Sequence, residues 1–428
     1  MLSRDFKDGL EFAKQMDAQD QLGEMRERFY QIPGEMYMDG NSLGLCSKDA
    51  EASLLNLLEL WKNEGIKIWN VEDSKYFHYS HLLAELNAPL VNADPEEIVI
   101  MGSTTSNIHQ ALATFYKPTK ERYKILVDDL NFPSDRYAID SIILLKGLDL
   151  DDTLKIVKSK DGRTIDEDDF IAAMTDDVAV IHLPSVLYRS SQLVDMEKIS
   201  KAAHERGIIV GFDLCHSIGS VPHDFKKIDP DYAVWCTYKY LSAGPGSIGG
   251  LFINKKHFDT RPGLAGWFGN KDETQFQLLH TFDHERNASG WQIGTPSFFS
   301  MAPLEGSLRI YKEVGMERIR EKSLHITAYL MYLIDTKLAK YGYGVGNPRD
   351  DAKRGGHVSL EHDEAYRICL ALKDNKVIPD YREPNVIRLA PVALYNTYEE
   401  TYQLVEILEK IALNKEYENF SAQRALVV

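Results

Sequence analysis

The hydrophobic positions of this chain fall into two kinds of segment that alternate along most of its length. Short unbroken apolar runs are typical of buried strands, and longer stretches with apolar residues every three or four positions are typical of amphipathic helices. This alternation predicts an α/β fold, a mostly parallel sheet flanked by helices. The expected strands cover residues 97–101, 124–127, 154–157, 178–181, 208–212, 232–236 and 251–254.

The stretches with helical spacing carry start and stop signals. Leucines at 54, 55, 57, 58 and 60 form an apolar helical face. Ser47 is a suitable N-cap for this helix and Gly65 a suitable stop, because serine accepts a hydrogen bond from a free backbone N–H and glycine tolerates a positive φ. Further helices are expected within residues 1–35 and at 80–91, 108–115, 166–174 and 195–205.

The last third of the chain has a different pattern. Residues 302–340 are strongly helical, and short strands and helices then alternate in a way that predicts a smaller α+β domain. These elements are strands at 356–360 and 385–389 and helices at 364–374 and 399–413. We therefore expect an N-terminal arm packing with the small domain (1–50), a large domain (51–305) and a small C-terminal domain (306–428).

Composition narrows the classes of function. The chain has 428 residues, 44% of them hydrophobic, and a formal net charge of −16, which argues against nucleic acid and anionic membrane surfaces as partners. The N-terminal residues lack the apolar centre of a signal peptide, and no apolar run approaches the ~20 residues that span a bilayer. We expect a soluble, cytoplasmic protein. The cysteines show no C-x-x-C spacing, so neither a zinc site nor a disulfide framework is expected from Cys46, Cys215, Cys236 and Cys369.

The segment 231–250 combines an apolar strand, a lysine and a glycine-rich turn. Lys239 follows the strand closely, and glycines at 244, 246, 249 and 250 follow Lys239. Burial disfavours the charged form of a lysine and makes its amine a nucleophile suited to a Schiff base with an aldehyde. Taken alone, Lys239 is more simply explained as a surface lysine that caps the strand.

A polar turn at 102–107 lies between a predicted strand and a predicted helix. Its Thr104 and Thr105 supply hydroxyl groups where a helix start also presents free backbone N–H groups. Such a turn can cradle a phosphate. Serine and threonine also cap helices that bind nothing, so the turn alone is a weak signal.

Two more strand ends carry polar or aromatic side chains. Phe132 and Asp135 lie in a predicted loop at 131–138, and Asp213 and His216 follow the strand at 208–212. In open α/β sheets, ligands bind at the carboxyl ends of the strands. Each residue alone has a simpler explanation as a cap or turn residue.

Together these features match the needs of pyridoxal 5′-phosphate (PLP). Its phosphate needs N–H donors, its ring a stacking face, its pyridine nitrogen a carboxylate and its aldehyde a lysine. Thr104 and Thr105, Phe132, Asp213 and Lys239 supply these groups at one predicted sheet edge. The combination favours a PLP site over the separate explanations.

Six motifs spread over nearly the whole chain carry a resemblance to a known family. They are DGNSLGL (39–45), FPSD (132–135), GFDLCHSIG (211–219), WCTYKYLSAGPG (235–246), GWFG (266–269) and RLAPVALYN (388–396). With these motifs the chain resembles kynureninases of the bacterial type, which are fold-type I PLP-dependent enzymes. The resemblance implies a large PLP-binding domain at 51–305.

The resemblance also implies roles for the matched residues. Lys239 would hold PLP as a Schiff base, and Tyr238 would contact the phosphate and is our candidate proton relay. Arg388 would grip the α-carboxylate of the substrate with its planar fork, and Trp69 would face the aryl ring. A surface ion pair is the alternative for Arg388. The implied cofactor-binding set is Thr104, Thr105, Phe132, Pro133, Ser134, Asp135, Asp213, His216, Tyr238, Lys239, Trp267 and Thr295. No metal is expected.

Two of these residues imply a partner subunit. The loops that carry Trp267 and Thr295 resemble loops that reach across a two-fold interface in the family. An obligate homodimer with shared active sites follows from the resemblance.

The implied reaction is hydrolytic Cβ–Cγ cleavage of L-kynurenine to anthranilate and L-alanine, in tryptophan and kynurenine metabolism. Trp69 and Gly294-Thr295 match the bacterial pattern and favour kynurenine over 3-hydroxy-L-kynurenine, which would give 3-hydroxyanthranilate. Pro184 stands where some members carry a phosphate-side serine, so that contact is not expected here.

Three alternatives stay open from the residues. An aminotransferase or cysteine desulfurase would share the fold, but a desulfurase needs a mobile cysteine, and Cys215 and Cys236 lie in strand-end segments. A non-catalytic binding module would not need Lys239, Asp213 and Arg388 together. A nucleotide-binding enzyme is disfavoured because no G-x-G-x-x-G or Walker motif follows a strand.

Overall fold

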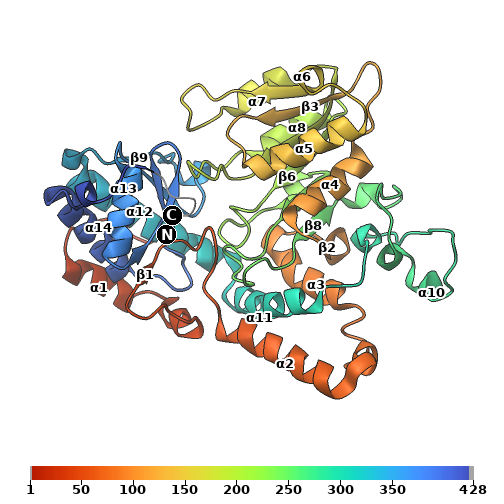
Figure 1. Cartoon of the computed structure of the whole chain (residues 1–428), viewed down its shortest axis with the longest axis horizontal. Helices are drawn as coiled ribbons and strands as arrows, with labels where there is room; N and C mark the ends of the chain where they lie inside the picture. Colours follow the sequence, from red (N-terminus) through yellow and green to blue (C-terminus); the bar gives the residue numbers. More distant parts are fainter. Residues whose placement is uncertain (1, 424–428) are drawn as a thin grey trace.

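A seven-stranded sheet forms the centre of the larger part of the chain in the computed structural model, which describes residues 2–423 (Figure 1). Its strands are β2 (Ile98–Ile100), β3 (Lys124–Asp128), β4 (Leu154–Val157), β5 (Val178–Pro184), β6 (Ile209–Asp213), β7 (Tyr232–Trp235) and β8 (Gly250–Ile253). The spatial order is β2-β8-β7-β6-β5-β3-β4. Strands β7, β6, β5, β3 and β4 are parallel, whereas β8 pairs antiparallel with both β7 and β2. The sheet is therefore mostly parallel, as the sequence predicts.

Helices cover both faces of this sheet. They are α3 (Tyr79–Val91), α4 (Thr104–Phe115), α5 (Pro133–Leu145), α6 (Leu150–Thr153), α7 (Glu167–Ala173), α8 (Met196–His204), α9 (Phe225–Ile228) and α11 (Phe298–Val314). Helix α2 (Lys48–Glu64) packs on α11, and α10 (Asp272–Gln275) lies on an extension away from the sheet (Figure 1). Successive residues of a strand point to opposite faces. In β7, Val234 packs with residues of α4 and α5, whereas Ala233 and Trp235 pack with residues of α3, α8 and α11. This two-sided burial explains why the strands are apolar throughout.

A smaller antiparallel sheet lies in the C-terminal part. Its strands are β9 (Gly344–Val345), β10 (Val358–Glu361), β12 (Asp380–Arg382) and β13 (Val386–Leu389), in the order β12-β13-β10-β9. Helices α12 (Met316–Leu333), α13 (Ala365–Asp374) and α14 (Tyr398–Leu413) contribute to the apolar core of this part. Sheet and helices form the α+β arrangement predicted for this region.

The N-terminal residues pack against the C-terminal part (Figure 1). Helix α1 (Leu10–Ala18) contacts α14, and β1 (Met36–Tyr37) pairs in parallel with β11 (Val377–Ile378). A 3₁₀ turn (Gly23–Arg28) lies between α1 and β1. Only part of the helix expected within residues 1–35 therefore forms.

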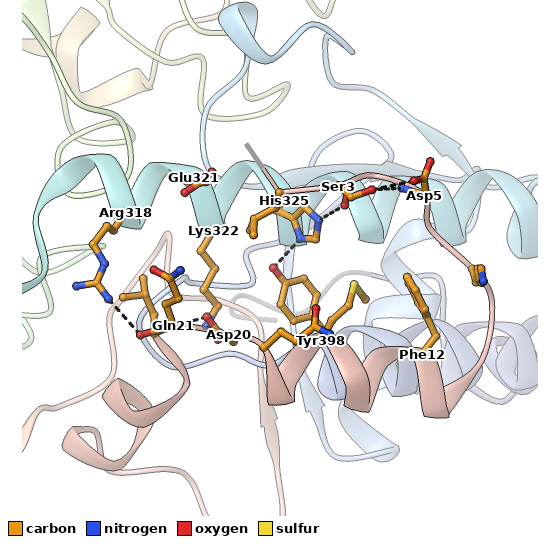
Figure 2. A pocket seen from close by; sticks show the side chains of 15 residues that line it. Ser3, Asp5, Phe12, Asp20, Gln21, Arg318, Glu321, Lys322, His325 and Tyr398 are labelled. Atoms are coloured by element: carbon orange, nitrogen blue, oxygen red, sulfur yellow. Dashed lines mark hydrogen bonds and ion pairs between the residues drawn. The ribbon is translucent and has the colours of Figure 1, made fainter.

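A cavity of about 350 Å³ separates the N-terminal residues from α12 (Figure 2). Within it, the ammonium of Lys322 and the carboxylate of Asp20 form a buried ion pair at 2.6 Å. The imidazole of His325 lies 2.8 Å from the carbonyl oxygen of Ser3 and 2.7 Å from the hydroxyl of Tyr398. These contacts hold the N-terminal segment along α12.

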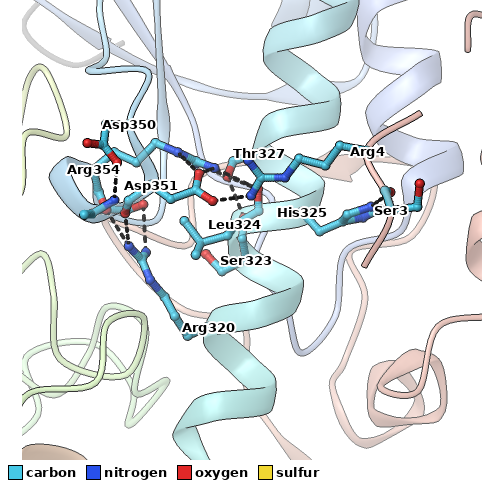
Figure 3. Close-up of polar contacts among 12 residues, drawn as sticks. Ser3, Arg4, Arg320, Ser323, Leu324, His325, Thr327, Asp350, Asp351 and Arg354 are labelled. Atoms are coloured by element: carbon cyan, nitrogen blue, oxygen red, sulfur yellow. Dashed lines mark hydrogen bonds and ion pairs between the residues drawn. The ribbon is translucent and has the colours of Figure 1, made fainter. Parts of the chain in front are cut away.

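A polar network ties the same segment to the loop before β10 (Figure 3). Arg4 forms an ion pair with Asp351, which also accepts a 2.7 Å hydrogen bond from Arg354. On α12, Thr327 accepts a hydrogen bond from Arg354, and Arg320 donates to the carbonyl oxygens of Asp351 and Arg354. Three segments that are distant in sequence are thereby held together.

Helix α2 begins and ends where its sequence signals predict. The hydroxyl of Ser47 accepts a hydrogen bond from the backbone N–H of Ala50 at 3.0 Å, and Gly65 takes a φ of 53°. These are the cap and the stop expected from serine and glycine.

One sequence prediction is wrong, and another is confirmed with one interruption. The loop expected at 131–138 ends early, because α5 begins at Pro133, and proline at the first position with Asp135 in the first turn favours a helix start. The helical stretch expected at 302–340 is broken at Gly315, where a φ of 83° separates α11 from α12. Helix α11 runs across residue 305, and the division into parts at residues 50 and 305 stays a prediction.

Among residues 2–423, every helix is too short or too polar to cross a lipid bilayer.

Candidate active site at the carboxyl edge of the large sheet

Lys239 lies in the turn that follows β7. Its amine nitrogen is 2.9 Å from Nε2 of His216 and 5.9 Å from the ring centre of Phe132. Burial and the nearby charge of Lys239 lower the pKa of His216 well below its ordinary value. The imidazole is therefore neutral at physiological pH and can accept a hydrogen bond from the amine.

The glycine-hinged loop 39–45 packs directly on this turn. The backbone N–H of Gly44 donates to the carbonyl oxygen of Tyr238 at 2.8 Å. A Cβ at position 44 would lie 2.4 Å from the carbonyl oxygen of Lys239, so only glycine fits there. Burial raises the pKa of Tyr238 well above its ordinary value, and its phenol keeps its proton at neutral pH.

Asp213 ends strand β6 and is almost fully buried. Its Oδ1 accepts a 2.7 Å hydrogen bond from the backbone N–H of Cys215. Burial, and second the charge of Asp135, raise the pKa of Asp213 to about 6, against an opposing effect of Lys239. A cation placed beside this carboxyl group would favour its ionised form. Pro184, the last residue of β5, is the cross-strand neighbour of Asp213.

Two helix N-termini meet beside these residues. The hydroxyls of Thr105, in the first turn of α4, and Ser134, in the first turn of α5, are 2.7 Å apart. The hydroxyl of Thr104 lies 3.3 Å from the sulfur of Cys215. Free backbone N–H groups and the helix dipoles make such a junction favourable for an anion.

Arg388 lies in β13 and is completely buried. The pairing of β12 with β13 sets it opposite Asp380, which accepts a 2.5 Å hydrogen bond from its Nε. Its Nη1 donates to the carbonyl oxygen of Tyr188 at 3.0 Å, and its Nη2 donates to the hydroxyl of Ser42 at 2.9 Å. The guanidinium is thus fixed by three segments, and its Nη1–Nη2 edge faces Tyr188 and Ser42.

Burial changes the pKa of Asp39, a carboxyl group near Arg388. Burial and the charge of Asp380 raise the pKa of Asp39 to about 6. The loop 39–45 thus contacts the Lys239 turn through Gly44 and contacts Arg388 through Ser42.

The sequence pattern does not mark two residues of the candidate site, Tyr188 and His357. The ring of Tyr188 packs edge-on against Phe132 at 5.4 Å, lies 6.4 Å from the ring of His216, and has the guanidinium of Arg388 at 6.0 Å from its centre. Tyr188 follows β5, so the strand-end rule could have found it. His357 is buried with its ring 6.1 Å from that of His216. It comes from the C-terminal part, where no local pattern marked it.

Three predicted site residues, Trp69, Trp267 and Thr295, do not lie among the residues that surround Lys239. Trp69 packs against the rings of Phe298 at 5.1 Å and Phe268 at 6.2 Å. The indole N–H of Trp267 donates to a backbone carbonyl at 3.1 Å, and Thr295 lines an apolar cavity of about 500 Å³ together with Trp69. Within residues 2–423, none of the three makes a recorded contact with Lys239.

The chain is similar to known proteins over its full length. Over 427 residues the chain is 56% identical to a kynureninase of Bacillus thuringiensis subsp. konkukian, and the match covers 100% of both chains. A kynureninase of Geobacillus thermodenitrificans is 52% identical over 418 residues, with 98% of both chains covered.

The chain belongs to the kynureninase family.

The family model for the kynureninase C-terminal domain matches residues 319–408, which include Arg388. The resemblance carried by the six sequence motifs is thereby confirmed.

Solved structures confirm the fold class. The apo cysteine desulfurase of Thermococcus onnurineus NA1 matches with a TM-score of 0.77 at 18% identity, covering 91% of this chain and 98% of that one. A cystine C–S lyase, C-DES, in complex with cysteine persulfide matches with a TM-score of 0.76 at 17% identity, covering 88% and 98%. At this identity the likeness concerns the fold, which is that of fold-type I enzymes.

Proposed function

We propose that the protein hydrolyses L-kynurenine to anthranilate and L-alanine by PLP-dependent cleavage of the Cβ–Cγ bond. The observation that carries the proposal is the position of the Lys239 amine, 2.9 Å from a neutral His216 and beside Phe132. The kynureninases that match the full length of the chain support the choice of substrate.

The residues at the sheet edge fit PLP. The junction of α4 and α5 at Thr105 and Ser134 offers donors for its phosphate. Nδ1 of His216 is buried and has no hydrogen-bond partner within residues 2–423, so it is available to a ligand. Asp213 is a buried carboxyl group of raised pKa whose ionised form a protonated pyridine nitrogen would favour.

When bound, PLP supplies a ring that accepts the electron pair released at the substrate Cα. Lys239 is the residue proposed to bond to its aldehyde carbon and, once displaced by the substrate amine, to take the Cα proton on its Nζ as general base. His216 holds that nitrogen in place through Nε2. Tyr238 keeps a proton on its phenol oxygen and is proposed to deliver it during cleavage.

Arg388 is proposed to bind the substrate α-carboxylate. Asp380 holds Nε and also pairs with Nη2, so an incoming carboxylate would meet the Nη1–Nη2 edge beside the contacts with Tyr188 and Ser42. The hydroxyl of Ser42 on this edge can rotate and donate to an incoming carboxylate. The buried ion pair fixes the fork before the substrate arrives, so little rotamer freedom is lost on binding.

We further propose a homodimer in which the segment 264–293 meets a second copy. This segment exposes large apolar side chains that a monomer would leave in water, among them Phe276 at 66% and Leu278 at 70% exposure. Figure 1 shows α10 on an extension away from the sheet. Trp267 and Thr295 would then complete the active site of the second copy. Trp69 would lie beside them and face the aryl ring of the substrate.

Incubation of purified protein with L-kynurenine tests the function. We expect anthranilate fluorescence and L-alanine in equal amounts, with slower turnover of 3-hydroxy-L-kynurenine. Alanine without anthranilate, or neither product, would reject the proposal. Formation of alanine from cysteine, with sulfide released when a thiol reductant is added, would point to a desulfurase instead, although Cys215 and Cys236 are both buried in the structure.

A further inference from the structure

A buried row of side chains crosses the large sheet beneath the candidate site. The strand register aligns His182 of β5 with Gly211 of β6, and Gly211 with Tyr232 of β7. Aligned residues of neighbouring strands point to the same face. Gly211 contributes no side chain, so the two outer residues of the row can meet above it.

The tyrosine ring fills the space over the glycine. A Cβ at position 211 would lie 2.0 Å from Cζ of Tyr232, and the hydroxyl of Tyr232 reaches Nδ1 of His182 at 3.1 Å. The two rings are nearly parallel, with 12° between their planes. On its other side the tyrosine ring stacks on Phe115 of α4 at 5.6 Å.

The other nitrogen of His182 faces the first turn of α5. Nε2 of His182 lies 3.4 Å from Oδ2 of Asp135, and both side chains are almost completely inaccessible to solvent. Neither atom has a hydrogen-bond partner within residues 2–423. A shift of a few tenths of an ångström turns this separation into a hydrogen bond of ordinary length, which is about 2.7–3.2 Å.

The hydroxyl of Tyr232 decides which histidine nitrogen carries the proton. Burial raises the pKa of Tyr232 well above its ordinary value, so the phenol stays protonated and donates to Nδ1. The proton of a neutral imidazole then sits on Nε2, facing the carboxylate of Asp135. An unpaired buried carboxylate is costly, so an N–H aimed at it stabilises its ionised form.

We infer that His182, with its tautomer set by Tyr232, is a positioning residue that keeps Asp135 oriented toward the cofactor site. The inference rests on the proposed function, because Asp135 belongs to the proposed PLP-binding set. It adds two residues that lie behind the site and touch neither substrate nor cofactor.

The titratable groups that face Asp135 come from three strands. They are Asp128 at the end of β3, His182 of β5 and Asp213 at the end of β6. The two neighbouring carboxyl groups offer no hydrogen-bond donor when ionised, whereas the Nε2–H of His182 is a donor aimed at Asp135. Loss of the Nε2–H should therefore leave the Asp135 side chain without this donor and weaken the site toward PLP.

Four variants separate positioning from packing. In His182→Gln the amide nitrogen falls near the position of Nε2 and can still donate to Asp135, whereas in His182→Asn it falls near Nδ1 and cannot. Tyr232→Phe removes only the hydroxyl that sets the tautomer. Phe115→Leu is the matched control, because it loosens packing on the tyrosine ring and leaves every polar group in place.

The measurements are the PLP dissociation constant of the apoprotein, the pH dependence of the absorbance of bound PLP, and the melting temperature. We expect His182→Asn to weaken PLP binding by about tenfold, as loss of one charge-assisted hydrogen bond would, and to shift the absorbance titration away from that of the wild type. Tyr232→Phe should shift the PLP dissociation constant and the absorbance titration in the same direction as His182→Asn, but by less. His182→Gln should stay close to wild type, and Phe115→Leu should lower only the melting temperature.

If His182→Asn and His182→Gln titrate alike, or if all four variants change the melting temperature alone, His182 is a packing residue and the inference is wrong. Failure of the wild-type apoprotein to bind PLP would instead reject the proposed function. The two failures are therefore distinguishable.

Discussion

The amine of Lys239 and Nε2 of His216 are 2.9 Å apart at the carboxyl edge of the large sheet. Burial and the nearby lysine hold the pKa of His216 well below its ordinary value. The amine therefore donates a hydrogen bond to a neutral imidazole. This contact fixes the position of the amine without pairing it with a carboxylate. A nucleophile that must form and release a covalent bond needs this kind of hold.

Lys239→Ala should abolish anthranilate production and the visible absorbance of bound PLP, because it removes the amine proposed to bond to the aldehyde. Lys312→Ala is the matched control, since Lys312 is exposed on the last turn of α11. Both variants should melt within a few degrees of wild type. Retained turnover in Lys239→Ala would remove Lys239 from the chemistry.

PLP affinity should fall as the pH drops through about 6, where Asp213 is half protonated, given its pKa of about 6. The ionised carboxylate is the form that pairs with a protonated pyridine nitrogen, so protonation removes the attraction. Titration of apoprotein with PLP between pH 5 and 8 measures the effect. Asp213→Asn should bind weakly at every pH, and a flat wild-type profile would contradict the assignment.

Arg388→Gln should raise KM for L-kynurenine by about tenfold or more, because a charge-assisted contact is worth about 1.5–3 kcal/mol. Arg349→Gln is the control, since Arg349 forms an exposed ion pair with Asp335. Steady-state kinetics with a parallel thermal melt separates lost binding from lost folding. An unchanged KM in a folded Arg388 variant would exclude the proposed carboxylate contact.

Asp231→Asn should destabilise the fold at neutral pH. The buried Asp231 faces His204 at 3.1 Å, His257 at 2.7 Å and Lys256 at 2.9 Å, and the hydrogen bonds from His204 and His257 lead the effects that hold its pKa well below the ordinary value despite burial. Its partners are partly exposed, so we expect a loss of about 2–3 kcal/mol, less than for a fully buried pair.

The pH dependence of this effect has a definite sign. A carboxyl group whose pKa is lower in the folded state stabilises the fold above its unfolded pKa of about 4, and this stabilisation is lost as the pH falls toward the folded value. Denaturant titrations at pH 7 and pH 3 should therefore show a smaller difference between wild type and Asp231→Asn at pH 3. Asp229→Asn, at a more exposed neighbouring site, should change stability less at both pH values.

Subunit complementation tests the shared active site. Co-expressed Lys239→Ala and Trp267→Ala chains should recover about a quarter of wild-type activity, because half of the dimers are mixed and each mixed dimer has one site with both residues intact. Lys239→Ala with Asp213→Asn is the control. Those two residues come from one chain in the structure, so each site of a mixed dimer carries one of the two changes and that pair should recover no activity.

Much of the large sheet and its ligand-binding edge could be predicted because the signals are local. Asp213 follows a strand of continuous apolar residues, and Thr104 follows a capping serine, so each is positioned by its immediate neighbours. The error at 131–138 has a local cause too. The local pattern predicts a loop at Pro133, although proline is also common at the first position of a helix.

Residues positioned by long-range pairing could not be found in this way. Asp380 reaches Arg388 through the register of β12 and β13, and the hydroxyl of Ser42 reaches it across 346 positions of sequence. His357 approaches His216 from a different part of the chain. Local hydrophobic spacing carries no information on such contacts, because they depend on how separate elements dock.

The empty position at Gly211 has a consequence for how relatives of this chain can diverge. A side chain at 211 and an aromatic ring at 232 compete for one volume, since a Cβ at 211 would overlap the tyrosine ring. Among homologues the two positions should therefore substitute together, with a smaller residue at 232 wherever 211 is not glycine. Loss of the tyrosine hydroxyl should in turn relax selection on the histidine at 182, so these three positions form one evolutionary unit.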